Sequence, residues 1–350
     1  MKHILVIFTG GTIGSQTAGA AIDVHEDMSF ELLHRYKEQY GDQASFTTDQ
    51  PFTILSENML PSDWDTLCDT IERHGTATYD GIIITHGSDT LAYTAAAISY
   101  RFAETSIPIL LTASNYPLDD PRTEGVRNFA ACVSMIVNDP LPGVFVVFED
   151  DQRHTLVHLG TRIRQSQPFT DQFESIYDEP IAEIIDGRLV LRDHPVNPDS
   201  AQLRAYRSRI NSHIHKFRFT GDILYVKPYP GFRYTYLQRG DKKPQAVLIE
   251  LYHSGTTGLR YASEEDSLEQ YILRCRSEGI PVYIAPIKDI SGSLYATSHE
   301  LFDYGAIPLA NISIEAALVK LMLAYGSLRD QREIDPLLAS SLFFEIVELR

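Results

Sequence analysis

Two short polar segments follow apolar runs that predict buried strands. Residues 9–12 (TGGT) come directly after the run 4–8, and residues 86–90 (HGSDT) come directly after the run 82–85. These segments offer hydroxyl groups and one carboxylate, which are groups that attack or bind a small polar substrate. Two glycines in the first segment allow a tight turn and a close approach of the backbone.

The strand ends predict a common site for these side chains. A helical pattern starts at Leu91, so Ser88, Asp89 and Thr90 lie between the end of a strand and the N-terminus of a helix. In open α/β sheets ligands bind at the carboxyl ends of strands, and helix N-termini there favour negative charge. Thr12 and Ser88 would project from neighbouring strand ends and face one ligand.

Motifs for other chemistries are missing from the sequence. A dinucleotide fingerprint would need glycine at position 9, where Thr9 stands, so a nicotinamide site is disfavoured. The sequence has no P-loop, no H-E-x-x-H and no G-x-S-x-G. Its 12 histidines show no metal-ligand spacing, and its three cysteines (Cys68, Cys132 and Cys275) are scattered. We therefore expect no metal, no disulfide framework and no cofactor.

Length and charge limit the class of protein. A chain of 350 residues predicts two domains, and an apolar share of 43% is ample for packed cores. The net charge of −17 argues against nucleic acid or an anionic membrane as a partner. No apolar run reaches the roughly 18 residues of a membrane span. The first residues enter a strand without a secretory signal, so we expect a cytoplasmic protein.

Strands and helices alternate along the chain, which is typical of a parallel sheet with crossover helices. We expect a larger N-terminal domain with a doubly wound, mainly parallel sheet over residues 1–191. A connection over 192–221, where apolar periodicity fades, leads to a smaller C-terminal α/β domain over 222–350. Within that domain, Ser263 and Asp266 form a pattern that predicts a capping box at the start of a helix.

The residues at both strand ends resemble those of a known family. Residues 9–13 (TGGTI) and 86–90 (HGSDT) look like the two signature segments of the bacterial-type L-asparaginases. Residues 55–59 (LSENM) resemble the short substrate-binding segment of that family, and residues 246–326 are similar to the C-terminal domain of its cytosolic type I branch. The resemblance covers roughly the whole chain, most securely residues 2–137. It implies a two-domain asparaginase-like architecture.

The resemblance also implies a reaction and a set of site residues. The reaction is hydrolysis of L-asparagine, or of a related amide, to L-aspartate and ammonia, with Thr12 as the nucleophile. Ser88 would belong to a second catalytic group, and Asp89 would bind the α-amino group of the substrate. The catalytic candidates are Thr12, Ser88, Asp89 and Arg162, and the substrate-binding candidates are Gly11, Ser56, Glu57, Gly87, Ser88 and Asp89.

Three positions depart from the family pattern. Ser88 stands where the family has threonine, which keeps the hydroxyl group. The family's catalytic lysine falls at Thr161-Arg162, and an arginine can orient a hydroxyl or stabilise an oxyanion but cannot serve as a base. The lid segment, residues 15–27, has no tyrosine where the family carries one. His25 and Glu26 on that segment are candidate substitutes for acid–base chemistry.

Three functions therefore stay open. The first is an amidohydrolase for a small amide, the second is a catalytically silent amino-acid-binding protein, and the third is an amidase for a peptide or modified amide. Simpler interpretations are that Ser88 and Thr90 cap a helix and that His86 is a hydrogen-bonded turn residue. The family also implies a homodimer or a dimer of dimers, in which a neighbour's C-terminal domain contributes to the site. The turn 252–258 is the best candidate for that contribution, and a plain surface turn is the alternative.

Overall fold

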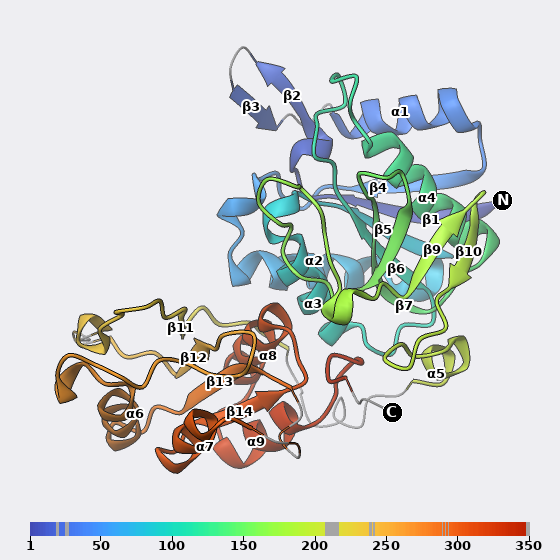
Figure 1. Ribbon diagram of the computed structural model, residues 1–350. Coiled ribbons are helices and arrows are strands. Elements are labelled where there is room, and N and C mark those ends of the chain that lie inside the picture. Colours follow the sequence, from blue (N-terminus) through green and yellow to red (C-terminus); the bar gives the residue numbers. More distant parts are fainter. Residues whose placement is uncertain are drawn as a thin grey trace. The chain divides into compact units, whose positions relative to one another are not determined.

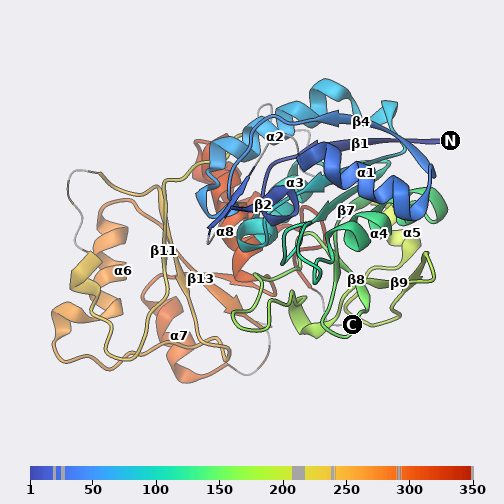
Figure 2. The same cartoon turned by 90° about the horizontal axis from the view of Figure 1, so that it is seen from above.

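The computed structural model describes residues 1–347 except 19–20, 25–27, 207–216, 238–239, 241, 289, 291 and 293, and it gives the main chain alone for the described residues between 14 and 30. The described chain divides into two compact units (Figures 1 and 2). The first contains residues 1–206 and 342–344, and the second contains residues 217–341 and 345–347. None of their described helices combines the length and apolar character needed to cross a membrane.

The first unit is built on a sheet of eight strands. In order across the sheet these are β10 (Arg188–Leu191), β9 (Ala182–Ile185), β8 (Thr155–Leu159), β7 (Gly143–Glu149), β6 (Pro108–Thr112), β5 (Gly81–Thr85), β1 (Lys2–Phe8) and β4 (Ala44–Asp49). The five strands from β7 to β4 are parallel, and β8, β9 and β10 are antiparallel. Strands β5 and β6 are buried throughout, as is typical of a parallel sheet covered on both faces.

The order of the strands reverses at β1. The chain leaves β1 for β4 on one side and later returns to the other side at β5. At such a switch point the loops after two neighbouring strands diverge and leave a crevice at the carboxyl ends. The predicted segments 9–12 and 86–90 follow β1 and β5, so both lie at this switch point.

Helices join these strands. The first unit contains α1 (Met28–Tyr40), α2 (Pro61–His74), α3 (Leu91–Arg101), α4 (Gly125–Asn138), α5 (Ser200–Ala205) and the 3-10 helices η1 (Thr12–Gly14), η2 (Ser56–Asn58), η3 (Thr76–Thr78), η4 (Ser88–Thr90) and η5 (Ile176–Asp178). Helix α1 packs against α4, where the Tyr36 and Phe129 ring centroids are 5.3 Å apart, and α2 packs against α3. A short hairpin of β2 (Ser15–Ala18) and β3 (Ala21–Val24) follows η1 and projects from the sheet (Figure 1).

The second unit has a parallel sheet of four strands. Its strands are β11 (Ile223–Val226), β12 (Ala246–Glu250), β13 (Val282–Ile287) and β14 (Ile307–Ala310), in that order. The helices are α6 (Leu268–Ser277), α7 (Ala296–Asp303), α8 (Ile314–Ser327), α9 (Gln331–Ala339) and the 3-10 helices η6 (Tyr234–Leu237) and η7 (Glu264–Asp266). Together with the larger sheet of the first unit, this confirms the predicted α/β class with two domains.

One predicted helix start in the second unit is wrong. The cap of α6 is Ser267, whose Oγ accepts a hydrogen bond of 3.1 Å from the Gln270 N–H. The predicted capping box begins one turn earlier, at Ser263, which is the N-cap residue of η7. Its partner Asp266 instead accepts hydrogen bonds from the hydroxyls of Thr235 (2.5 Å) and Ser263 (3.1 Å). The Asp266 carboxylate therefore binds Thr235 of η6 and does not complete a capping box.

The last described residues are divided between the two units. Residues 342–344 belong to the first unit, where the Phe343 carbonyl accepts a hydrogen bond of 2.8 Å from the Thr161 hydroxyl. Residues 345–347 belong to the second unit, where Glu345 forms a fully buried ion pair of 2.7 Å with Lys320. The predicted boundaries thus differ from the observed units in two places, because α5 lies in the first unit and residues 342–344 return to it.

Candidate active site

Three loops meet at the carboxyl ends of β1 and β5. The Thr9 hydroxyl donates to the Thr85 carbonyl at 2.8 Å, which ties the two strand ends together. The segment before η2 joins them, because the Ile54 N–H donates to the Thr9 carbonyl at 3.1 Å and the Gly11 N–H donates to the Ile54 carbonyl at 3.2 Å. These bonds continue the sheet pattern beyond β1 and bring residues 54–58 beside residues 9–12.

Glycine is required where the three loops touch. Gly11 has a φ of 78°, and a Cβ there would lie 2.5 Å from Gly87 Cα. A Cβ on Gly87 would lie 2.5 Å from Ser56 Oγ. Both distances are far below van der Waals contact, so any larger side chain would push the loops apart. Gly11, Gly87 and Ser56, all predicted to bind substrate, are thus packed together.

Three hydroxyl groups border this contact. Thr12 lies in η1 and Ser88 in η4, both partly exposed, whereas Ser56 in η2 is only 5% exposed. Within the described residues, the structure gives none of these three hydroxyls a hydrogen-bond partner. Since buried polar groups normally find partners, a hydroxyl without one beside a strand end is available to a ligand.

Thr90 stands at the N-cap position of α3, as the simpler interpretation expected, but its hydroxyl does not cap the helix. Neither Ser88 nor Thr90 makes a side-chain capping bond to α3. The Thr90 hydroxyl donates instead to the Ser56 carbonyl at 2.8 Å and links η4 to η2. The Ser88 side chain is therefore not used to cap the start of α3 and remains at the site.

Two carboxylates stand at the rim of these loops. Asp89 is exposed at the start of the helical segment that leads into α3, and Glu57 is exposed in η2. Neither forms an ion pair with a described residue. A free carboxylate at this edge suits Asp89 to a substrate ammonium group, which would supply the missing opposite charge.

His86 is a hydrogen-bonded turn residue, as predicted. Its Nδ1 lies 2.8 Å from the Gly87 carbonyl and its Nε2 lies 3.0 Å from Thr94 Oγ1. The side chain is fully buried, and this burial lowers the pKa of His86 to about 4. With both nitrogens engaged, His86 cannot take a proton from a substrate or nucleophile.

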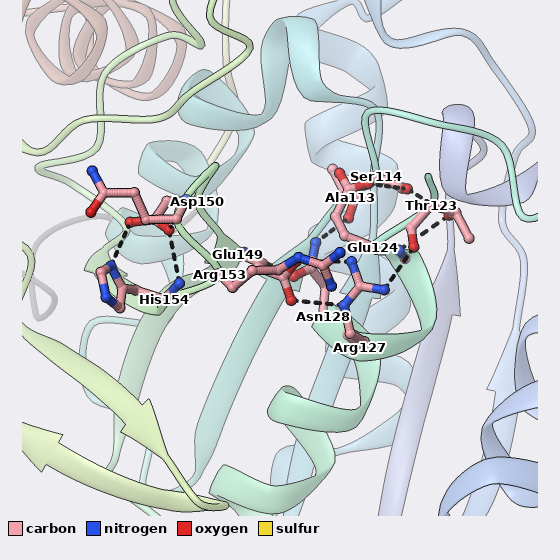
Figure 3. Close-up of polar contacts among 12 residues, drawn as sticks. Ala113, Ser114, Thr123, Glu124, Arg127, Asn128, Glu149, Asp150, Arg153 and His154 are labelled. Atoms are coloured by element: carbon pink, nitrogen blue, oxygen red, sulfur yellow. Dashed lines mark hydrogen bonds and ion pairs between the residues drawn. The ribbon is translucent and has the colours of Figure 1, made fainter. Parts of the chain in front are cut away.

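The sequence did not predict a hydrogen-bond network around Glu124, which lies beside the site. Glu124, which precedes α4, is only 6% exposed and accepts hydrogen bonds from the Asn115 N–H (2.5 Å) and the Ser114 hydroxyl (3.3 Å). Burial raises the pKa of Glu124 above its usual range. The available signal was an acidic residue at the first position of a helical pattern over residues 124–137. Figure 3 shows Ser114 and Thr123, from the loop after β6, beside Glu124.

The same network fixes α4 against the first signature segment. Arg127 forms two bonds of 2.8 Å with the Glu149 carboxylate, and Asn128 bridges the Ala113 carbonyl and the Glu149 N–H (Figure 3). A Cβ on Gly125 would lie 3.2 Å from Ile13, the neighbour of Thr12. The ends of β6 and β7 thus buttress η1 through the first turn of α4.

The structure does not bring Arg162 to this edge of the sheet. The turn after β7 reverses the chain, so β8 runs antiparallel and Leu159 at its end pairs with Phe145 near the start of β7. Strand β8 also lies three strands from β5, which is about 14 Å. The Arg162 guanidinium is buried and donates to the carbonyls of Phe344 (2.6 Å) and Val196. Arg162 therefore anchors residues 342–344 in the first unit.

Comparison with known proteins identifies the family of this chain. The asparaginase family profile described as "Asparaginase, N-terminal" matches residues 3–197, more than half of the chain. The chain belongs to the asparaginase family. This confirms the resemblance found in residues 9–13 and 86–90.

The relatives of this asparaginase-family chain include two kinds of protein. The D subunit of glutamyl-tRNA(Gln) amidotransferase from Aeropyrum pernix is 29% identical over 362 residues, covering 99% of this chain and 80% of the relative. The same protein of Metallosphaera sedula is 26% identical over 98% of this chain and 76% of the relative. The solved structures of the thermostable L-asparaginase from Thermococcus kodakarensis and L-asparaginase I from Vibrio cholerae have TM-scores of 0.78 and 0.79, each 25% identical over 99% of both chains.

Other expectations for this asparaginase-family protein concern its lid and its turn. The described parts of the lid form the hairpin β2–β3, and His25 and Glu26 lie outside the described residues. The turn 252–258 follows β12 and is closed by a bond of 2.8 Å from the Tyr252 N–H to the Thr256 carbonyl. Across the described chain, no group of three or more acidic, histidine or cysteine side chains is placed to hold a metal ion.

Proposed function

We propose that this asparaginase-family chain hydrolyses the side-chain amide of L-asparagine or of a related small amide, with Thr12 as the nucleophile. The observation that carries this proposal is the three-loop contact at Gly11, Gly87 and Ser56. Thr12 and Ser88 lie beside this contact, at the ends of the neighbouring strands β1 and β5. Their hydroxyls form no hydrogen bond with a described residue. A hydroxyl nucleophile and backbone donors at a helix start are what amide hydrolysis requires.

The reaction has two steps. The Thr12 oxygen attacks the amide carbon, the C–N bond breaks, and the nitrogen leaves as ammonia with the proton that Thr12 has lost. Water then cleaves the acyl–threonine ester to give the carboxylate and restore the hydroxyl. The negative oxygen formed on each attack is favoured by the N–H groups and dipole at the start of η4. We keep His25 and Glu26 as candidate carriers of the proton, because His86 is fully engaged.

Substrate binding uses the remaining groups at the rim. The exposed Asp89 carboxylate would pair with the α-amino group, and the Ser56 hydroxyl would donate to the α-carboxylate. Glu57, on the same short helix as Ser56, would lie at the mouth of the site. Gly11 and Gly87 would let the substrate approach the backbone. We leave Arg162 out of this set because it anchors residues 342–344.

A second candidate is an amidase component that acts on a larger amide. It is favoured by the relatives named as the D subunit of glutamyl-tRNA(Gln) amidotransferase, which match almost the whole chain. A silent amino-acid-binding protein would have no need of the Thr12 hydroxyl. We further propose a cytoplasmic homodimer or dimer of dimers, as the resemblance to the bacterial-type L-asparaginases implies.

The test is ammonia release from L-asparagine, D-asparagine, L-glutamine and short asparaginyl peptides, with Thr12→Ala as the control. Turnover that is lost in Thr12→Ala supports the amidohydrolase, and the preferred amide identifies the substrate. Turnover restricted to peptides supports the second candidate. Absence of turnover from the whole panel, with the protein folded, leaves the binding protein as the better account.

A further inference from the structure

A continuous line of buried side chains leads from α2 to the second signature segment. The Trp64 indole N–H donates to Thr94 Oγ1 at 2.9 Å, and Thr94 Oγ1 lies 3.0 Å from His86 Nε2. On the other side of the ring, His86 Nδ1 lies 2.8 Å from the Gly87 carbonyl oxygen. Trp64 is 5% exposed, and Thr94 and His86 are 0% exposed, so water does not compete for these bonds.

Only one placement of protons satisfies every bond in this line. An indole nitrogen can only donate and a carbonyl oxygen can only accept, so His86 Nδ1 must carry a proton toward Gly87. Burial lowers the pKa of His86 to about 4, so the ring is neutral at neutral pH and Nε2 is an acceptor. The Thr94 hydroxyl therefore accepts from Trp64 and donates to His86. The Trp64 N–H at one end of the line can only donate and the Gly87 carbonyl at the other end can only accept, and together they set the tautomer of His86.

This arrangement fixes the direction of one peptide group at the proposed site. A trans peptide is planar, and its C=O and N–H point in opposite directions. Because the Gly87 carbonyl is held toward the buried imidazole, the N–H of Ser88 points away from it. Within the described residues that N–H has no partner, as expected for the first turn of a helix. Gly87 itself is pressed between Gly11 and Ser56.

We infer that His86 is a positioning residue, which acts as the neutral Nδ1–H tautomer set by Thr94 and Trp64 to orient the Gly87–Ser88 peptide toward the substrate. The inference rests on the proposed function for its consequence in catalysis. It does not make His86 a proton carrier, since both ring nitrogens are used. Loss of the Thr94 hydroxyl would leave the buried Nε2 without its donor, so the ring would lose one of the two bonds that hold it against the Gly87 carbonyl.

The direct test is nitrogen NMR of the wild-type protein with 15N-labelled histidine. The His86 signals are assigned by their loss in His86→Gln. We expect a protonated Nδ1 and an unprotonated Nε2 at neutral pH. A protonated Nε2 in the wild-type protein would overturn the inference, and this measurement needs no substrate. It therefore separates a failure of this inference from a failure of the proposed function.

The matched variants are Thr94→Val, which keeps the shape and removes the hydroxyl, and Thr94→Ser, which keeps the hydroxyl. The chain has one tryptophan, so a single indole N–H signal reports whether Trp64 has lost its acceptor. We expect Thr94→Val to shift the Ser88 amide signal and to lower kcat by about tenfold or more with little change in KM, and Thr94→Ser to restore most of both.

A purely structural role would give a different result. Thr94→Val would then lose stability but keep the Ser88 amide signal and a kcat within about twofold of wild type, measured where the variant is fully folded. That outcome would overturn the inference. If no amide is turned over by the wild type, the proposed function fails, and the Ser88 amide signal in the two variants still decides whether Thr94 orients this peptide.

Discussion

The contact between Gly11 and the second signature segment can be tested by adding one methyl group. In Gly11→Ala the new Cβ would lie 2.5 Å from Gly87 Cα and 2.7 Å from the His86 carbonyl carbon. Both are main-chain atoms, which cannot rotate away from the methyl group. The φ of 78° at Gly11 is also a left-handed conformation that alanine disfavours.

The expected loss of stability is the sum of these two effects. A left-handed φ costs an L-residue about 1–2 kcal/mol, and forcing a methyl group into a packed contact costs about 1–3 kcal/mol. We therefore expect Gly11→Ala to lower the free energy of unfolding by about 2–5 kcal/mol. The matched control is Gly41→Ala, because Gly41 has a φ of 74° but no atom within 4 Å of its Cβ position. The control should lose only about 1–2 kcal/mol.

The assay is urea unfolding followed by the fluorescence of Trp64, the single tryptophan, which reports on the first unit. Ammonia release is measured on the same proteins. A displacement of η1 from η4 by about 1 Å would lower turnover about 100-fold in Gly11→Ala and leave Gly41→Ala active. Equal destabilisation of the two variants, together with full activity in Gly11→Ala, would refute the three-loop contact.

Three further predictions concern charged and titrating groups. Asp89→Asn should raise KM for a substrate with a free α-amino group by about 10- to 100-fold, because a charged hydrogen bond is lost. Glu345→Gln should lower the free energy of unfolding of the second unit by about 3–5 kcal/mol in urea, since it leaves the fully buried Lys320 ammonium without its opposite charge. His86 and His158 are buried, and burial lowers the pKa of each to about 4. The unfolded chain therefore binds protons that the folded chain does not between about pH 6.5 and pH 4, so unfolding measured over this range should show a loss of about 3 kcal/mol per histidine as pH falls.

Each of these has a control. For Asp89, a substrate without the α-amino group should show the same KM in wild type and variant, and equal sensitivity of both substrates would remove Asp89 from the site. For Glu345, the partly exposed pair of Lys2 and Asp80 should contribute less than about 1 kcal/mol when Asp80 is changed to Asn. For the histidines, His158→Gln should remove about half of the pH-dependent loss, and an unchanged pH profile would contradict the burial argument.

The sequence was sufficient to predict the strands and helices that carry the signature segments. The run 82–84 is wholly apolar because β5 is buried on both faces, so this strand could be predicted directly from the sequence. The helical pattern that starts at Leu91 was visible in the same way and corresponds to α3. The sequence also indicated that Thr12 and Ser88 follow strand ends, because glycine and polar residues interrupt the apolar runs at those positions.

What the sequence missed depends on contacts between distant segments. The capping box was placed at Ser263, but the Asp266 carboxylate binds the distant Thr235 hydroxyl, and the Gln270 N–H donates to Ser267 instead. Arg162 was misplaced because the turn at residues 150–154, closed by the Asp150 carboxylate, reverses the chain and carries β8 away from the site. The burial of Glu124 likewise follows from the loop after β6 folding over it, which no local pattern records.

Thr12 is the residue that we propose to carry the acyl intermediate where the three loops meet. The decisive experiment is peptide mass spectrometry of protein quenched in acid during turnover of a slow amide substrate. We predict an acyl group on the peptide that contains Thr12, and no such adduct in Thr12→Ala. An acyl group on the peptide that contains Ser88, or undiminished turnover in Thr12→Ala, would show that Thr12 is not the nucleophile.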